Sequence, residues 1–247
     1  FLPSALFGTL HEAGHALYEQ GVSPELARSG LDTGISLGVH ESQSRLWENL
    51  VGRSRPFWQH FFPQLQAVFP EALGAVDVEG FYRAINISKP SLIRVEADEV
   101  TYNLHIIIRF ELELDLLTGA LQLDDLPVAW NEKYERYLGV RPENDAEGVL
   151  QDIHWSTGAI GYFATYSIGN LLSVQILNSA RKALPSLDTD IAAGEFGALL
   201  QWLQDNIHRH GSKFTPRELV QRVTGGAMDS RPYMRYLREK YSDIYAL

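Results

Sequence analysis

The sequence predicts a mainly α-helical protein with at most a small β element. Long segments carry apolar residues spaced by three and four positions, and Gly and Pro residues separate them. Alternation with period two is confined to short stretches at residues 35–39 and 109–116. The chain has 247 residues and a hydrophobic fraction of 45%, which is enough for one sizeable core.

The first predicted helix covers residues 4–20, because Pro3 stands near its start and Gly21 just beyond its end. A glycine-rich stretch follows, in which residues 35–39 could form a short strand. The second helix is expected over residues 40–53.

The next helix is rich in aromatic residues and is expected to be interrupted at Pro63. Residues 109–116 could form a strand, but the run that contains them is long and has helical spacing, which favours one long helix. No repeat, low-complexity tract or clear internal boundary is found. The remaining helices are predicted over residues 57–69, 91–117, 127–138, 189–209, 216–224 and 229–241.

Composition excludes several classes of function. Because the chain has no cysteine, it has no disulfide, and any metal site must use His, Asp or Glu. This composition fits a cytoplasmic location. The net charge of -10 argues against binding to nucleic acid or an anionic membrane. No segment approaches the ~18 unbroken apolar residues of a membrane span, and residues 1–10 lack the positive charge of a signal peptide.

Residues 11–15 read HEAGH inside the first predicted helix. His11 and His15 lie four positions apart, so both imidazoles project from one helix face and can bind one ion. Glu12 stands beside them, where a carboxylate can take a proton from the attacking water. The pattern therefore predicts a zinc site, although a surface helix with two unrelated histidines is the alternative.

Zinc needs a third protein ligand. The extended pattern HExxHxxGxxH is absent, so this ligand must come from a later element. The best candidate is Glu41, in the run HESQSRLWEN, while Glu25, Glu48 and His40 remain alternatives. His40 could also orient Glu41, or it could cap the second helix.

Other residues could bind a peptide. Arg94 suits a terminal carboxylate because its planar fork holds both oxygens, although the residues alone favour a salt bridge on a charged helix face. His154, Tyr162 and Tyr166 could donate to a developing oxyanion if they share a helix face. The alternative for these three is tight helix packing with buried tyrosine hydroxyls.

The remaining histidines are expected to be structural. His208 and His210 form an HxH near a predicted helix end, which is typical of a solvated terminus that favours positive charge. His60 and His105 lie in apolar surroundings and are expected in the core.

Four blocks occur in a defined order over residues 1–170: HEAGHALYEQG, HESQSRLWEN, IRVEADEVTYNLH and GVLQDIHWSTGAIGYFATYSIGN. Together they resemble the carboxypeptidase Taq family of metallocarboxypeptidases. The resemblance implies a helical zincin fold with a deep groove, similar to neurolysin and angiotensin-converting enzyme. It also implies stepwise removal of C-terminal residues from peptides with broad specificity, zinc that cobalt can replace, and a homodimer.

The resemblance also implies roles for single residues. His11 and His15 match the two histidine ligands, Glu12 matches the catalytic carboxylate, and Glu41 matches the third ligand.

Arg94 matches an arginine that faces the substrate, while His154 and Tyr166 resemble a substrate-binding His and Tyr twelve positions apart in neurolysin-like peptidases.

Family members are about twice as long, and their Asp-x-Arg-x-Thr block is missing here. Residues 1–247 are therefore expected to be the catalytic C-terminal half of a larger two-lobed peptidase. The alternatives are an oligoendopeptidase or dipeptidase on the same scaffold, and an inactive half that needs a partner chain.

Overall fold

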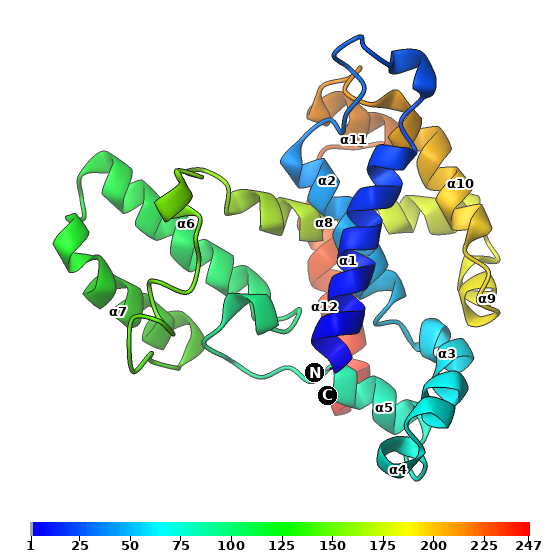
Figure 1. Cartoon of the computed structure of the whole chain (residues 1–247), viewed down its shortest axis with the longest axis horizontal. Coiled ribbons are helices and arrows are strands. Elements are labelled where there is room, and N and C mark those ends of the chain that lie inside the picture. The colour runs from blue at the N-terminus through cyan, green and yellow to red at the C-terminus, as the bar shows by residue number, and fades with distance from the viewer. Residues whose placement is uncertain (1) are drawn as a thin grey trace. The chain divides into compact units, whose positions relative to one another are not determined.

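The computed structural model describes residues 2–247. These residues form helices and no strand, which confirms the mainly α prediction (Figure 1). The optional strand at residues 35–39 does not form. The hydroxyl of Ser36 instead accepts a hydrogen bond from the backbone N–H of Val39 and caps the next helix, which begins at Leu37.

Most helices follow one another with short connections, but the segments before α2, before α6 and after α7 are long. Their bounds are α1 Leu2–Gln20, α2 Leu37–Arg45, α3 Arg55–Val68, α4 Pro70–Leu73, α5 Val78–Ile85, α6 Tyr102–Thr118, α7 Leu126–Leu138, α8 Ala164–Ala183, α9 Leu187–Ala192, α10 Gly197–Asn206, α11 Pro216–Thr224 and α12 Arg231–Tyr245.

Two compact units share these helices. The first unit contains Phe1–Asn86 and Ile168–Leu247, and the second contains Ile87–Ser167. The second boundary falls inside α8, where helical periodicity continues across it. No break in sequence pattern marks that position.

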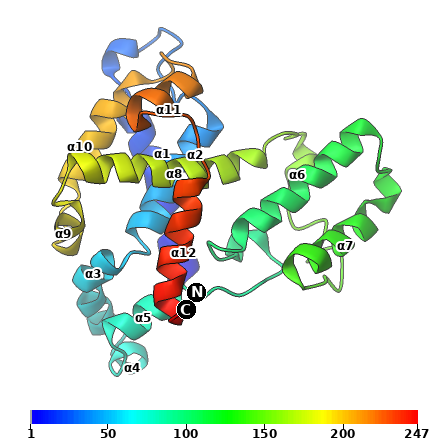
Figure 2. The same cartoon turned by 180° about the vertical axis from the view of Figure 1, so that it is seen from behind.

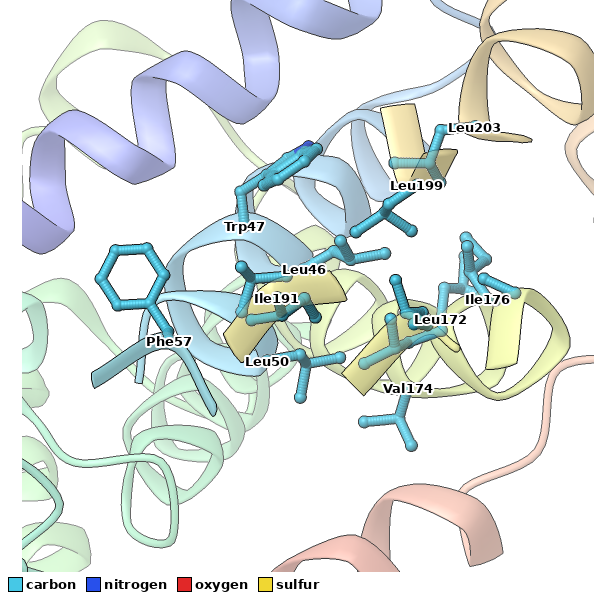
Figure 3. Close-up of a cluster of buried hydrophobic side chains, with 14 of the residues drawn as sticks. Leu46, Trp47, Leu50, Phe57, Leu172, Val174, Ile176, Ile191, Leu199 and Leu203 are labelled. Carbon is cyan, nitrogen blue, oxygen red and sulfur yellow. The ribbon is translucent and has the colours of Figure 1, made fainter. Parts of the chain in front are cut away.

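The core of the first unit surrounds a π-helical turn, η2 (Leu46–Val51), that continues from α2. α1 packs against both α2 and this turn. Helices α3, α8, α9 and α10 supply the other side chains that Figure 3 labels, and α1, α5, α11 and α12 also contribute to this core. The labelled members are Leu46, Trp47, Leu50, Phe57, Leu172, Val174, Ile176, Ile191, Leu199 and Leu203. Because η2 is embedded in this core, α2 is held firmly beside α1.

The second unit is built on α6 and α7, which run side by side in both views (Figures 1 and 2). Their facing side chains form a separate core that includes Ile108, Leu112, Trp130 and Tyr134. Irregular segments precede α6 and follow α7, and they carry the polar residues that the sequence singled out.

The helix predicted over residues 91–117 is wrong at its start. Residues 94–96 form only a 3-10 turn, η3 (Arg94–Glu96), and α6 begins at Tyr102. The carboxylate of Asp98 accepts hydrogen bonds from the backbone N–H groups of Val100 and Thr101. Such side-chain bonds compete with helix formation, which explains why helical spacing alone was misleading here.

Other boundaries differ less. α3 continues through Pro63, where an interruption was predicted. The helix predicted over residues 189–209 is divided at Gly194, whose φ of +78° favours glycine. The predictions for α1, α7, α11 and α12 are confirmed within a few residues. Within residues 2–247, every helix is too short or too polar to cross a lipid bilayer.

Candidate active site

Three predicted ligands meet in the first unit. His11 and His15 project from one face of α1, and their ring centroids lie 4.9 Å apart. Glu41 reaches them from α2: its Oε2 lies 3.6 Å from His11 Nε2 and 3.4 Å from His15 Nε2. The structure therefore brings together the two histidines and the carboxylate that the sequence placed in different helices.

The spacing of these donors fits a tetrahedral ion. Bonds of about 2.0–2.1 Å in a tetrahedral zinc site place neighbouring donor atoms about 3.3 Å apart. The observed separations of 3.4 and 3.6 Å are close to this value, and the donors of all three residues lie within 4.8 Å of one another. Glu25 is exposed and is not part of this group. Two imidazole nitrogens and a carboxylate oxygen are a donor set that suits zinc and cobalt.

The carboxylate of Glu41 is 5% exposed and is held in its anionic form. Burial raises the pKa of such a group, but the hydrogen bond with His15 and the charge of Arg45 outweigh it and lower the pKa of Glu41 to about 2. Arg45 Nε donates to Glu41 Oε1 at 2.7 Å, and Ser44 Oγ donates to Oε2 at 3.2 Å. These bonds fix the side chain while Oε2 faces the histidines.

Two glycines allow the close approach of the ligand helices. A Cβ atom on Gly14 would lie 2.6 Å from the backbone oxygen of Gln43, so only glycine fits between α1 and α2 at this point. A Cβ atom on Gly169 of α8 would overlap the side chain of Glu41. The glycine in HEAGH therefore has a packing role that spacing alone does not reveal.

Further polar residues hold the far sides of the two imidazoles. Glu48 Oε2 lies 2.9 Å from His11 Nδ1, and His40 Nδ1 lies 2.5 Å from His15 Nδ1. Glu48 was one alternative for the third ligand, but here it contacts the ring nitrogen opposite Glu41. His40 contacts His15 rather than Glu41, which it could have oriented, and the predicted alternative of a helix cap is wrong because Ser36 caps α2. Glu12 is exposed on the same turn of α1.

In the second unit, His154, Tyr162 and Tyr166 gather as predicted, but by a different route. His154 precedes the turn η5 (Trp155–Thr157), and Tyr162 precedes α8. The prediction that the three residues share one helix face is therefore wrong. The chain reverses through two glycines with positive φ in between. His154 Nε2 nevertheless lies 2.9 Å from the hydroxyl of Tyr166, and the His154 and Tyr162 ring centroids are 5.4 Å apart.

Arg94 is 6% exposed and is paired with a residue that the sequence analysis missed. Its Nε and Nη2 donate to Asp152 Oδ1 at 3.0 and 2.7 Å. The fully buried Arg109 donates to Asp152 Oδ2 at 2.6 Å, and His154 Nδ1 lies 3.7 Å from Oδ1. Burial raises the pKa of Asp152, but the bond with Arg94 and the charge of Arg109 outweigh it and lower that pKa. One carboxylate thus positions both Arg94 and Arg109, whereas His154 Nδ1 is too far from it for a hydrogen bond.

The predictions for the structural histidines are partly confirmed. His105 is fully buried as expected, and burial with the charge of Arg109 lowers its pKa to about 3. His60, which was also expected in the core, is only half-buried. The prediction that His208 and His210 lie at a solvated helix end is wrong for His208. This residue is fully buried, and its Nε2 lies 2.9 Å from Gln43 Oε1. Burial lowers the pKa of His208 to about 4.

An all-helical fold with an HExxH helix and a carboxylate from the following helix defines the class of helical zincin-type metallopeptidases. The comparison with protein families agrees with this class. The family described as carboxypeptidase Taq (M32) metallopeptidase matches residues 1–241, and the chain belongs to this family. The resemblance found in the four sequence blocks is thereby confirmed.

Named relatives support this assignment. The chain is 54% identical over 245 residues to thermostable carboxypeptidase 1 of Thermus thermophilus, covering 99% of this chain and 48% of that protein. It is 43% identical to carboxypeptidase 1 of Bacillus subtilis, covering 99% and 49%. Among solved structures, the M32 carboxypeptidase of Deinococcus radiodurans superimposes with a TM-score of 0.96 at 52% identity, covering 98% of this chain and 49% of that chain. The chain therefore spans about half the length of the relatives it matches.

Proposed function

We propose that this chain is the metal-binding half of a zinc metallocarboxypeptidase that removes C-terminal amino acids from peptides with broad specificity. The observation that carries the proposal is the spacing of three donor atoms, with Glu41 Oε2 at 3.4 and 3.6 Å from two imidazole nitrogens. Membership of a metallopeptidase family whose named relatives are carboxypeptidases supports the reaction.

In this proposal His11, His15 and Glu41 hold Zn²⁺, for which Co²⁺ can substitute. The bound ion would polarise the scissile carbonyl and make the attacking water more acidic. Glu12 follows a ligand directly in sequence and is exposed on the ligand helix, so its carboxylate can accept the proton of that water. The same carboxyl group then donates the proton to the leaving amine.

Residues of the second unit would bind the peptide. The guanidinium of Arg94, oriented by Asp152, suits the terminal carboxylate of a substrate. His154 and Tyr166 would stabilise the developing oxyanion, and Tyr162 would line the peptide site beside them. A donor that is held in place before the reaction stabilises the transition state without the cost of reorganisation.

We further propose that the working molecule includes a second half, either on the same chain or as a separate chain, because the relatives are about twice as long. A homodimer and a cytoplasmic location complete the proposal. The absence of cysteine from the 247 residues agrees with that location.

The test uses a chimera in which this chain replaces the matching half of the Thermus thermophilus relative. The chimera should release amino acids from a peptide with a free C-terminus and lose at least ~100-fold in rate when that carboxylate is amidated, because Arg94 then has no partner. Its Glu12→Gln variant should keep bound zinc but lose hydrolysis. The unaltered relative serves as the control.

Equal cleavage of free and amidated peptides would replace the carboxypeptidase proposal by an oligoendopeptidase on the same scaffold. A folded, zinc-loaded chimera that cleaves neither peptide, while the control is active, would contradict the proposal. Full turnover by the Glu12→Gln variant would remove the general-base role.

A further inference from the structure

We propose that His40 and Glu19 form a relay that fixes His15 in its metal-binding tautomer, whereas Glu48 alone fixes His11. The two histidine ligands would thus be positioned by different means. This inference rests on the proposed metal site and assigns a positioning role to residues outside the ligand set. It is carried by three contacts: His15 Nδ1 to His40 Nδ1 at 2.5 Å, His40 Nε2 to Glu19 Oε1 at 2.8 Å, and His11 Nδ1 to Glu48 Oε2 at 2.9 Å.

The proton positions follow from the hydrogen-bonding capacity of imidazole. A neutral imidazole has one N–H donor and one acceptor nitrogen. When His15 gives its Nε2 to an ion, its proton must be on Nδ1, which therefore donates to His40 Nδ1. The proton of His40 is then on Nε2, where it meets the carboxylate of Glu19. One arrangement of protons satisfies both contacts at once.

The surroundings of the relay leave little room for His40 to move. A Cβ atom on Gly34 would lie 2.8 Å from His40 Cδ2 and 3.1 Å from Glu19 Oε1. The backbone N–H of Gly34 also donates to Glu19 Oε1 at 3.1 Å. The ring of Tyr18 lies 5.1 Å from the ring of His40 on another side. The glycine-rich segment before α2 therefore packs closely around the relay.

His11 is held in a simpler way. Its partner Glu48 lies in the π-helical turn η2, and its side chain is 13% exposed. Arg45 Nη1 donates to Glu48 Oε2 at 3.1 Å, while Nε of the same arginine donates to Glu41. One guanidinium thus joins the carboxylate ligand to the carboxylate that orients His11. On the His15 side the direct partner is a neutral ring, and the carboxylate is one step further away.

Two substitutions of His40 distinguish its hydrogen-bonding role in the relay from a role in packing. Phe keeps an aromatic ring but has no acceptor, whereas the Oδ1 of Asn takes nearly the position of the lost Nδ1 and can still accept from His15. Loss of such a partner typically weakens metal affinity 10–100-fold. We expect His40→Phe to bind zinc about 10–100-fold more weakly and His40→Asn to recover most of that loss.

The measurement is competition of the chimera, which carries this chain with the second half of the Thermus thermophilus relative, with a chromophoric chelator for Zn²⁺, together with the visible absorption bands of bound Co²⁺. Those bands report ligand geometry and should change in His40→Phe only. His60→Phe is the matched control, since it makes the same substitution in α3 outside the ligand group and should leave zinc affinity unchanged. Far-ultraviolet circular dichroism verifies that each variant is folded.

Each outcome is decisive. Wild-type affinity in a folded His40→Phe variant would overturn the relay while leaving the zinc site intact. Equal losses in His40→Phe and His40→Asn would show that His40 acts through ring packing, which also overturns it. Failure of the folded chimera without substitutions to bind zinc would instead remove the proposed site itself, and the relay with it.

Discussion

Gly14→Ala tests how closely the two ligand helices must approach. The added Cβ would lie 2.6 Å from both the backbone oxygen of Gln43 and the Cα of Ser44, whereas ordinary contact begins at 3.4 Å. Both contacted atoms are backbone, so no side chain can rotate away. α1 and α2 must therefore separate locally by the difference, about 0.8 Å.

That displacement acts directly on the metal site, because Glu41 lies on α2 two residues before Gln43. Metal–ligand distances tolerate only about 0.2 Å, so a shift of this size should weaken zinc binding at least ~10-fold. The effect on folding is smaller. Overpacking costs about 1–3 kcal/mol, and the better helix propensity of alanine offsets about 1 kcal/mol of it.

Gly8→Ala is the matched control on the same helix. No heavy atom lies within 4 Å of its added Cβ, so this variant should gain up to ~1 kcal/mol in stability and keep its zinc affinity. Urea unfolding in the presence of a chelator gives the stability of each variant, and chelator competition gives the affinity. Zinc binding by Gly14→Ala as tight as that of the wild type would refute the reasoning.

Two further predictions concern buried charge and acid. Asp152→Ala leaves Arg94 and Arg109 without their shared carboxylate, so urea unfolding should show a loss of about 3–5 kcal/mol, and a loss below ~1 kcal/mol would contradict the buried ion pairs. His208 has a folded-state pKa of about 4 against 6.5 when unfolded, so the unfolded chain binds more protons between these values and stability falls as pH drops through that window. The slope contributed by this residue is at most about 1.4 kcal/mol per pH unit, and His208→Gln should remove that contribution in pH-dependent unfolding. If the free energy of unfolding depends on pH equally in the variant and the wild type, the acid sensitivity comes from other residues.

Local signals were sufficient for part of the fold and the site. Pro and Gly punctuation located α1, α7 and α11, and the spacing of His11 and His15 followed from helix geometry. The third ligand was different. Residue chemistry made Glu41 the best of several candidates but left Glu25, Glu48 and His40 open. The family resemblance strengthened the choice, because the approach of Glu41 depends on the packing of Gly14 against α2.

The missed features are tertiary. Arg109 and Asp152 lie 43 positions apart in sequence, so no periodicity connects them, although the adjacent Gln151–Asp152 pair in the fourth block was a signal. Gln151 also accepts hydrogen bonds from the backbone of Arg94 and from Arg109. The burial of His208 likewise depends on its contact with Gln43, and its position near a helix end pointed to solvent instead.

A crystal structure of the zinc-loaded chain, with the ion located by anomalous scattering, tests the central claim most directly. The account predicts one ion about 2.0–2.1 Å from Nε2 of both His11 and His15, and about 2.0–2.2 Å from a carboxylate oxygen of Glu41. Ordered zinc bound elsewhere, or bound to these histidines with Glu48 as the third ligand, would contradict it.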